Sequence, residues 1–157
     1  MEIKIIAVGN LKEKYWKEAS NEYALRLSKY TKVQIIEIDE AKVSSETGAY
    51  LEKAKDEEGQ RILKKIKANE QVVLLDLEGQ KLNSLELAKQ IEQIFIKTST
   101  IVFIVGGSYG VSQAVKQRAD LIMSFSNLTF PHQLFRVILL EQLYRSFKII
   151  NNEKYHK

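Results

Sequence analysis

The sequence predicts an α/β protein in which helices flank a mostly parallel sheet. Short runs of β-branched residues alternate along the chain with segments whose apolar residues recur every three or four positions. Two of the runs, at residues 101–105 and 121–123, end on a glycine-rich loop and a polar loop. Because the carboxyl ends of parallel strands share one edge of a sheet, we expect these two loops to converge on one ligand.

The first half of the chain contains two predicted strands, each followed by a predicted helix. The strands are expected at residues 3–8 and 33–38, and the helices at residues 12–28 and 51–66. The apolar stripe of the first helix, which includes Trp16, is interpreted as core. The polar residues 39–50 are expected to form a loop.

The second half continues the same alternation. A third strand is expected over QVVLLDL, ending at Glu78-Gly79-Gln80-Lys81, and Asn83 or Ser84 can cap the helix that follows. The remaining predicted elements are a helix at 85–97, the strand at 101–105, a helical pattern at 111–118, the apolar run at 121–123 and a helix at 131–150.

The last predicted helix is apolar on more than one face. Its apolar residues run from Leu134 to Phe147, and the chain's only proline, Pro131, stands at its expected first position. A helix of this kind needs more cover than its own sheet provides, so we expect it to form a subunit interface. His132 is interpreted as shaping the start of this helix.

Composition narrows the class of protein. At 157 residues the chain is expected to be a single domain, residues 1–157. Without cysteines and with only two histidines, we expect a reducing compartment and no metal site. No apolar run is long enough to span a bilayer, and the first residues enter a strand pattern at once, so a cytoplasmic protein is expected. A net charge of +4 permits binding to nucleic acid without requiring it.

The glycine-rich loop Gly106-Gly107-Ser108-Tyr109-Gly110 matches neither the dinucleotide fingerprint nor the P-loop. Two interpretations remain open from the residues alone. The glycines permit a tight turn, or they let the backbone approach a ligand. The nearby loop 124–127 and the Pro131-His132 pair favour the second interpretation.

Several blocks of the sequence resemble the ribosomal RNA large subunit methyltransferase H family, and the resemblance extends over nearly the whole chain. The blocks are VGNLKEKYW, EGQRIL, LDLEGQKLNS, FIVGGSYGV, SFSNLTFPHQLFRVILLEQLYRSFKI and the final YHK. The resemblance implies a SPOUT-class enzyme that methylates N3 of a pseudouridine in 23S rRNA in the ribosome, using S-adenosylmethionine. It also implies a C-terminal trefoil knot, which is rare among proteins, and a homodimer.

The resemblance also implies a cofactor site. Its residues are Leu75, Gly106, Phe125, Ser126, Asn127, Leu128, Thr129 and Phe130. These lie at the strand ends where the pattern already predicts a ligand. Glycines there admit close backbone contact, and the apolar side chains can form walls.

Catalysis and RNA binding are expected to depend on the end of the chain. Removal of the N3 proton needs a base or a stabilising charge, and His156 and Tyr155 are the candidates. The residues expected to bind rRNA phosphates are Arg136, Arg145, Lys154 and Lys157. Two alternatives remain: a non-catalytic module that binds RNA or the ribosome, and a SPOUT methyltransferase that acts on tRNA.

Overall fold

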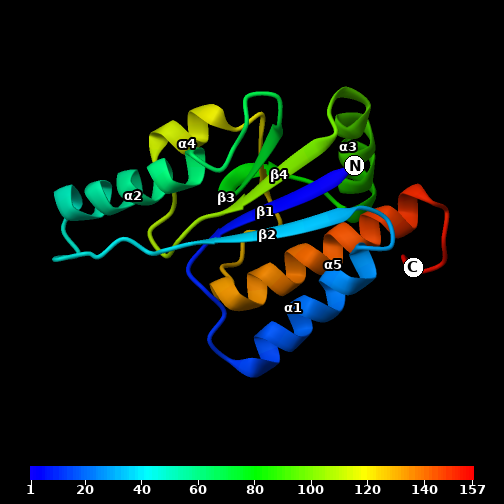
Figure 1. Ribbon diagram of the computed structural model, residues 1–157, viewed down its shortest axis with the longest axis horizontal. Coiled ribbons are helices and arrows are strands. Elements are labelled where there is room, and N and C mark those ends of the chain that lie inside the picture. The colour runs from blue at the N-terminus through cyan, green and yellow to red at the C-terminus, as the bar shows by residue number, and fades with distance from the viewer.

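The computed structural model describes residues 1–157 as five strands alternating with five helices (Figure 1). The strands are β1 (Glu2–Val8), β2 (Lys32–Ile38), β3 (Gln71–Lys81), β4 (Thr100–Val105) and β5 (Leu121–Ser124). The helices are α1 (Lys14–Leu27), α2 (Gly48–Leu63), α3 (Ser84–Lys97), α4 (Gln113–Arg118) and α5 (His132–Ile150). None of these helices has the length and apolar character needed to cross a membrane.

The five strands form one sheet in the order β2-β1-β4-β3-β5, and every neighbouring pair is parallel. The predicted α/β fold is therefore confirmed. The carboxyl ends of all five strands lie at one edge. β5 pairs with β3, although β4 precedes it in the chain, so the chain passes from β4 across to the far side of β3. The trefoil knot stays a prediction.

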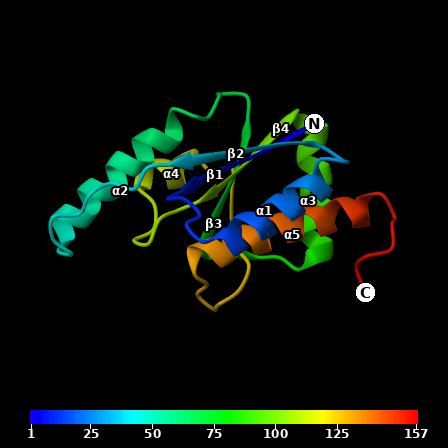
Figure 2. The same cartoon turned by 60° about the horizontal axis from the view of Figure 1, so that its bottom comes forward.

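The sheet separates two apolar cores (Figure 2). Alternating residues of β1 point to opposite faces, as the two-residue period of a strand requires. Ile3 and Ile5 pack in the larger core, which α1, α3 and α5 cover, while Ile6 and Val8 pack in the smaller core beneath α2 and α4. The runs at β1 and β4 are mainly apolar because both faces of these central strands are buried. The buried exception is Lys4 of β1, whose ammonium pairs with Glu70 at 2.5 Å.

The helix α5 lies between α1 and α3, and none of its side chains is fully exposed. Leu139, Leu140 and Leu143 pack in the larger core together with Phe147. The apolar character of α5 on several faces thus has an explanation within one chain, and it does not require a subunit interface. The homodimer stays a prediction.

Several predicted boundaries were wrong. α1 begins two residues later than predicted, at Lys14. α2 begins at Gly48 and ends at Leu63, so it takes in the end of the predicted loop and stops before Ile66. α5 begins at His132, with Pro131 as its N-cap residue. The predicted cap of α3 is confirmed as Asn83, whose side chain accepts a hydrogen bond from the backbone N–H of Glu86.

The third strand also extends beyond its predicted end. We predicted that β3 would end at Leu77 and turn at residues 78–81, but the strand continues through that segment to Lys81. A bulge between Leu75 and Gln80 lets the strand resume its pairing with Met123 of β5. Gly79 lies against this backbone: a Cβ atom built there would stand 2.5 Å from the carbonyl carbon of Met123.

Candidate functional site

A cavity of about 250 Å³ opens at the carboxyl ends of β3, β4 and β5. Its walls come from residues 75–77 within β3, from the two loops that follow β4 and β5, and from the start of α5. The lining residues are Leu75, Asp76, Leu77, Val105, Gly106, Gly107, Ser108, Gly110, Val111, Met123, Ser124, Phe125, Ser126, Leu128, Thr129, Phe130, His132 and Phe135. The two loops that the sequence predicted would converge therefore meet in space.

The loop after β4 closes on itself. The backbone N–H of Gly110 donates to the carbonyl of Gly107 at 3.1 Å, and Gly110 has a φ of 87°, a conformation that favours glycine. Gly106 leaves no room for a side chain, because a Cβ there would stand 2.6 Å from the Val111 side chain. Ser112 then caps α4 by accepting from the backbone N–H of Val115. The glycines thus serve the turn and also keep backbone groups at the cavity wall.

The loop after β5 is held by its own serines. The Ser124 hydroxyl donates to the carbonyl of Ser126 at 2.9 Å, and the Ser126 hydroxyl accepts from the backbone N–H of Leu128 at 3.0 Å. Phe125 and Phe130 both pack against Phe135 of α5, with ring centroids 5.2 and 6.2 Å apart. These contacts fix an aromatic wall before any ligand binds.

The structure brings together seven of the eight predicted cofactor residues. Only Asn127 does not line the cavity, and its side chain is exposed. Sequence reasoning missed Asp76, Leu77 and Phe135 as lining residues. Asp76 and Leu77 follow Leu75 directly on β3, so their position near a strand end was the available signal. For Phe135 there was no such signal, because it is one of many apolar residues in a long helix.

Asp76 is the only acidic residue among the lining residues, and none of them is a lysine or an arginine. One of its carboxylate oxygens accepts from the backbone N–H of Glu78 at 2.9 Å, and the other lies 3.9 Å from the Lys116 ammonium. The other lining residues offer mainly apolar side chains, together with neutral backbone and hydroxyl groups. Such a site suits a ligand with flat apolar faces, polar edges and a positive charge.

The two candidate catalytic residues lie far from this cavity within one chain. The Tyr155 hydroxyl donates to the Glu141 carboxylate at 3.1 Å, and its ring packs edge-on against Tyr144. Nδ1 of His156 lies 3.5 Å from Arg145. His132, by contrast, lines the cavity, and Glu141 follows it by nine residues, or about 14 Å of helix. Within one chain the tail therefore lies away from the cavity, and the catalytic role of Tyr155 and His156 stays a prediction.

Burial raises the pKa of Tyr155 to about 12, and the hydrogen bond to Glu141 adds to the effect. The guanidinium of Arg145 stands 4.7 Å above the Tyr155 ring. The same Arg145 pairs with Glu141 at 2.5 Å, and this hydrogen bond raises its pKa. The tail is therefore docked on the last turns of α5 as a small polar network.

The four cations expected to bind RNA are found in different settings. Lys154 and Lys157 are exposed, and Arg145 is partly covered by Tyr155. Arg136 is 5% exposed, and its guanidinium donates to the Glu37 carboxylate at 2.8 Å and to the carbonyl of Gly9. Because its donors are already used inside the protein, we exclude Arg136 from the surface proposed to bind RNA.

A parallel sheet with an apolar cavity at the carboxyl ends of its strands is typical of an α/β protein that binds an organic ligand. The model of the family described as "Predicted SPOUT methyltransferase" matches residues 1–156, and the chain belongs to this family. SPOUT methyltransferases methylate RNA with S-adenosylmethionine as the methyl donor.

Two solved structures are similar in fold. The tRNA (m1G37) methyltransferase from Aquifex aeolicus has a TM-score of 0.54 and 16% sequence identity, over 92% of this chain and 70% of that one. A probable methylase family protein from Haemophilus influenzae Rd KW20 has a TM-score of 0.54 and 12% identity, over 99% of this chain and 70% of that one. At these identities the likeness supports the SPOUT fold and no finer assignment.

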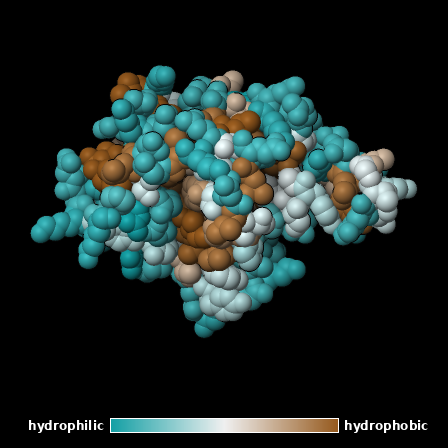
Figure 3. Space-filling model, turned by 180° about the vertical axis from the view of Figure 1, so that it is seen from behind, coloured by the Kyte–Doolittle hydropathy of each residue, from teal (hydrophilic) through white to brown (hydrophobic).

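The residues at the cavity fit S-adenosylmethionine. Leu75, Leu128 and Phe130 offer apolar contact to the faces of an adenine ring. The glycine-rich loop offers backbone groups to polar edges, and the closely packed wall at Gly106 keeps that backbone within reach. Asp76 supplies a negative charge for the cationic end of the molecule. Two apolar side chains at this site, Leu77 and Leu128, are exposed to solvent. Figure 3, which shows the molecule from behind, has apolar surface near its centre.

Proposed function

We propose that this protein uses S-adenosylmethionine to methylate N3 of a pseudouridine in 23S rRNA, acting on the assembled ribosome. The observation that carries the proposal is the cavity in which seven of the eight cofactor residues implied by the sequence resemblance meet. The family match supports RNA methylation, and the blocks FIVGGSYGV, SFSNLTFPHQ and YHK support the ribosomal target.

Bound S-adenosylmethionine supplies an electrophilic methyl group. The task of the protein is then to align that group with the attacking nitrogen and to keep water away, and much of the rate gain of such a displacement comes from positioning. The rigid loop from Ser124 to Phe130 holds one side of the cavity and Asp76 holds the other. An apolar surrounding also strengthens the attraction between Asp76 and a cation.

Loss of the N3 proton requires a further group. Tyr155 and His156 remain our candidates, and we propose that they act from the tail of a second copy in a homodimer. Their distance from the cavity of their own chain supports this arrangement. With a pKa of about 12, Tyr155 is a hydrogen-bond donor at neutral pH, so His156 is the better candidate for a base.

A tRNA substrate is the alternative within the same family, and the fold similarity to a tRNA methyltransferase keeps it open. We favour rRNA because the blocks that resemble the ribosomal family extend along the whole chain. A non-catalytic module that binds RNA or the ribosome is the alternative from another class. Binding of S-adenosylmethionine separates it from both enzymes.

The decisive experiment measures transfer of labelled methyl from S-adenosylmethionine to ribosomes that lack the modification, to purified rRNA and to tRNA. Label in the large-subunit rRNA of assembled ribosomes alone is the expected result. Label in tRNA would favour the other substrate, and label in naked rRNA at an equal rate would contradict the assembled target. No label and no binding of the cofactor would contradict the enzyme assignment.

A further inference from the structure

A second cavity, of about 630 Å³, lies beside the first at the carboxyl ends of β1 and β2. Its walls come from the segment after β1, from α1, from the segment after β2 and from the start of α5. Ser108 and His132 line both cavities. A molecule bound in the second cavity would therefore lie next to a ligand in the first cavity, with Ser108 and His132 in contact with both.

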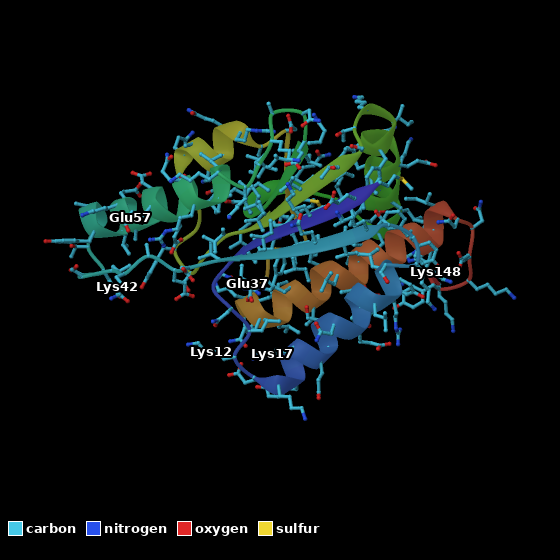
Figure 4. All side chains as sticks on the ribbon, in the orientation of Figure 1. Lys12, Lys17, Glu37, Lys42, Glu57 and Lys148 are labelled. Atoms are coloured by element: carbon cyan, nitrogen blue, oxygen red, sulfur yellow. The ribbon has the colours of Figure 1, made fainter.

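The floor of the second cavity is fixed by ionic and backbone contacts. Arg136 donates to Glu37 and to the carbonyl of Gly9, and Glu37 also accepts from the backbone N–H of Leu11 at 3.2 Å. Gly9 has a φ of 84°, which turns the chain from β1 toward α1. Figure 4 shows Glu37 at the end of β2, and Lys12 at the segment that follows β1.

The charges at this cavity do not suit a phosphate. Lys12 and Arg136 face three carboxylates, those of Glu37, Asp39 and Glu40, and Arg136 is already paired. The expected occupant is therefore neutral and polar. Trp16, the only tryptophan of the chain, adds a broad apolar ring to the wall. A ring that lies beside polar groups is a common platform for a nucleic-acid base.

One polar atom at the cavity has no partner. Oε1 of Gln133 is buried and accepts no hydrogen bond within the chain. A buried acceptor left without a donor is costly, and Gln133 lines the cavity. A rotation of its side chain that turns Oε1 toward a bound ligand with an N–H donor would therefore satisfy this acceptor and increase affinity. Gln133 lies next to His132 on α5, and so next to the wall shared by the two cavities.

We propose that the second cavity receives the target base, flipped out of the RNA, and that Gln133 distinguishes pseudouridine from uridine. This inference rests on the proposed function. Pseudouridine carries two ring N–H groups, at N1 and N3, whereas N1 of uridine is bonded to the sugar. With N3 turned toward Ser108 and the methyl donor, the N1–H is free to donate to Oε1 of Gln133 while Trp16 contacts the ring. Uridine has no second N–H to offer.

The first test uses Trp16 as a fluorescent reporter. The nucleoside pseudouridine, which carries no phosphate, should quench the tryptophan at lower concentration than uridine, by about tenfold, the effect of one hydrogen bond worth about 1.4 kcal/mol. Gln133→Leu should remove this difference. Gln133→Glu keeps acceptor oxygens and should restore part of it, and Gln117→Leu, on the exposed face of α4, should change nothing.

The second test measures methyl transfer to ribosomes with pseudouridine or uridine at the target position. Gln133→Leu should lower kcat/KM for pseudouridine about tenfold and leave the affinity for S-adenosylmethionine unchanged, because Gln133 does not line the first cavity. Equal quenching by both nucleosides, or an unchanged preference in Gln133→Leu, would overturn the inference. If the wild type methylates no RNA but still prefers pseudouridine to uridine, the proposed function fails while base binding at this cavity stands.

Discussion

Tyr155 shows how one side chain can be kept from acting as a base. Its pKa lies near 12, against 10.0 for an unperturbed tyrosine, because burial and the Glu141 carboxylate both disfavour the phenolate. Its contribution to the free energy of unfolding is therefore fully present below pH 10 and is lost as pH rises through about 12.

We predict that Tyr155→Phe removes the tyrosine that ionises last. A spectrophotometric titration at the tyrosinate absorption band measures this, with Tyr50→Phe, an exposed residue of α2, as the control. The wild type and the control should retain an ionisation near pH 12 that the Tyr155 variant lacks. If Tyr155→Phe instead removes an ionisation near pH 10, the ordinary value for tyrosine, then Tyr155 is not buried in the wild type and the tail is not docked on α5.

At the scale of elements, the pairing of β3 with β5 sets the position of the cavity. The bulge in β3 brings Asp76 and Leu77 to the wall, and Gly79 then lets the two backbones approach. The same pairing aligns Ser124, the last residue of β5, after which the loop that holds Phe125 and Phe130 begins. A change at Gly79 should therefore affect stability and ligand binding together.

We predict that Gly79→Ala lowers the free energy of unfolding by about 1–3 kcal/mol, the usual effect of overpacking, and weakens binding of S-adenosylmethionine. Urea denaturation and calorimetry measure the two effects. Gly48→Ala is the matched control, because a Cβ there meets no atom within 4 Å. Wild-type stability in Gly79→Ala would mean that β3 and β5 separate more easily than this packing implies.

Much of the element order could be predicted from the sequence, because the central strands β1 and β4 are buried on both faces and consist mainly of apolar residues. The end of β3 could not be predicted, since Glu78-Gly79-Gln80 has the composition of a turn and is held in the sheet only by β5. The convergence of the two cavity loops could be predicted, because the carboxyl ends of parallel strands lie at one edge of a sheet. The burial of Arg136 could not be predicted, because its partner Glu37 is 99 residues away in the chain.

For the whole molecule, the positive charges at the C-terminal end form the proposed contact with rRNA. Lys154 and Lys157 are exposed there, whereas Lys148 is paired with Glu153. Figure 4 shows Lys148 near this end and Lys42 at the opposite side of the molecule. The proposed surface is therefore small, and shape must contribute to the recognition of the ribosome.

We predict that ribosome binding weakens steeply as salt rises, and that the double variant Lys154→Ala, Lys157→Ala has a shallower dependence. The slope of log affinity against log salt should fall by roughly one unit for each phosphate that the variant no longer neutralises. Lys42→Ala with Lys53→Ala removes the same charge elsewhere and serves as the control. An identical slope in the tail variant and the wild type would exclude this end as the RNA-binding surface.

The strand order has a consequence for how the protein is made. The cavity needs β3 and β4 from the middle of the chain, but its remaining walls come from β5, the loop after it and α5. α5 in turn completes the larger core between α1 and α3. During synthesis, the growing chain therefore has no complete site until its last helix has emerged from the exit tunnel. An enzyme interrupted before that point should be unable to hold its methyl donor.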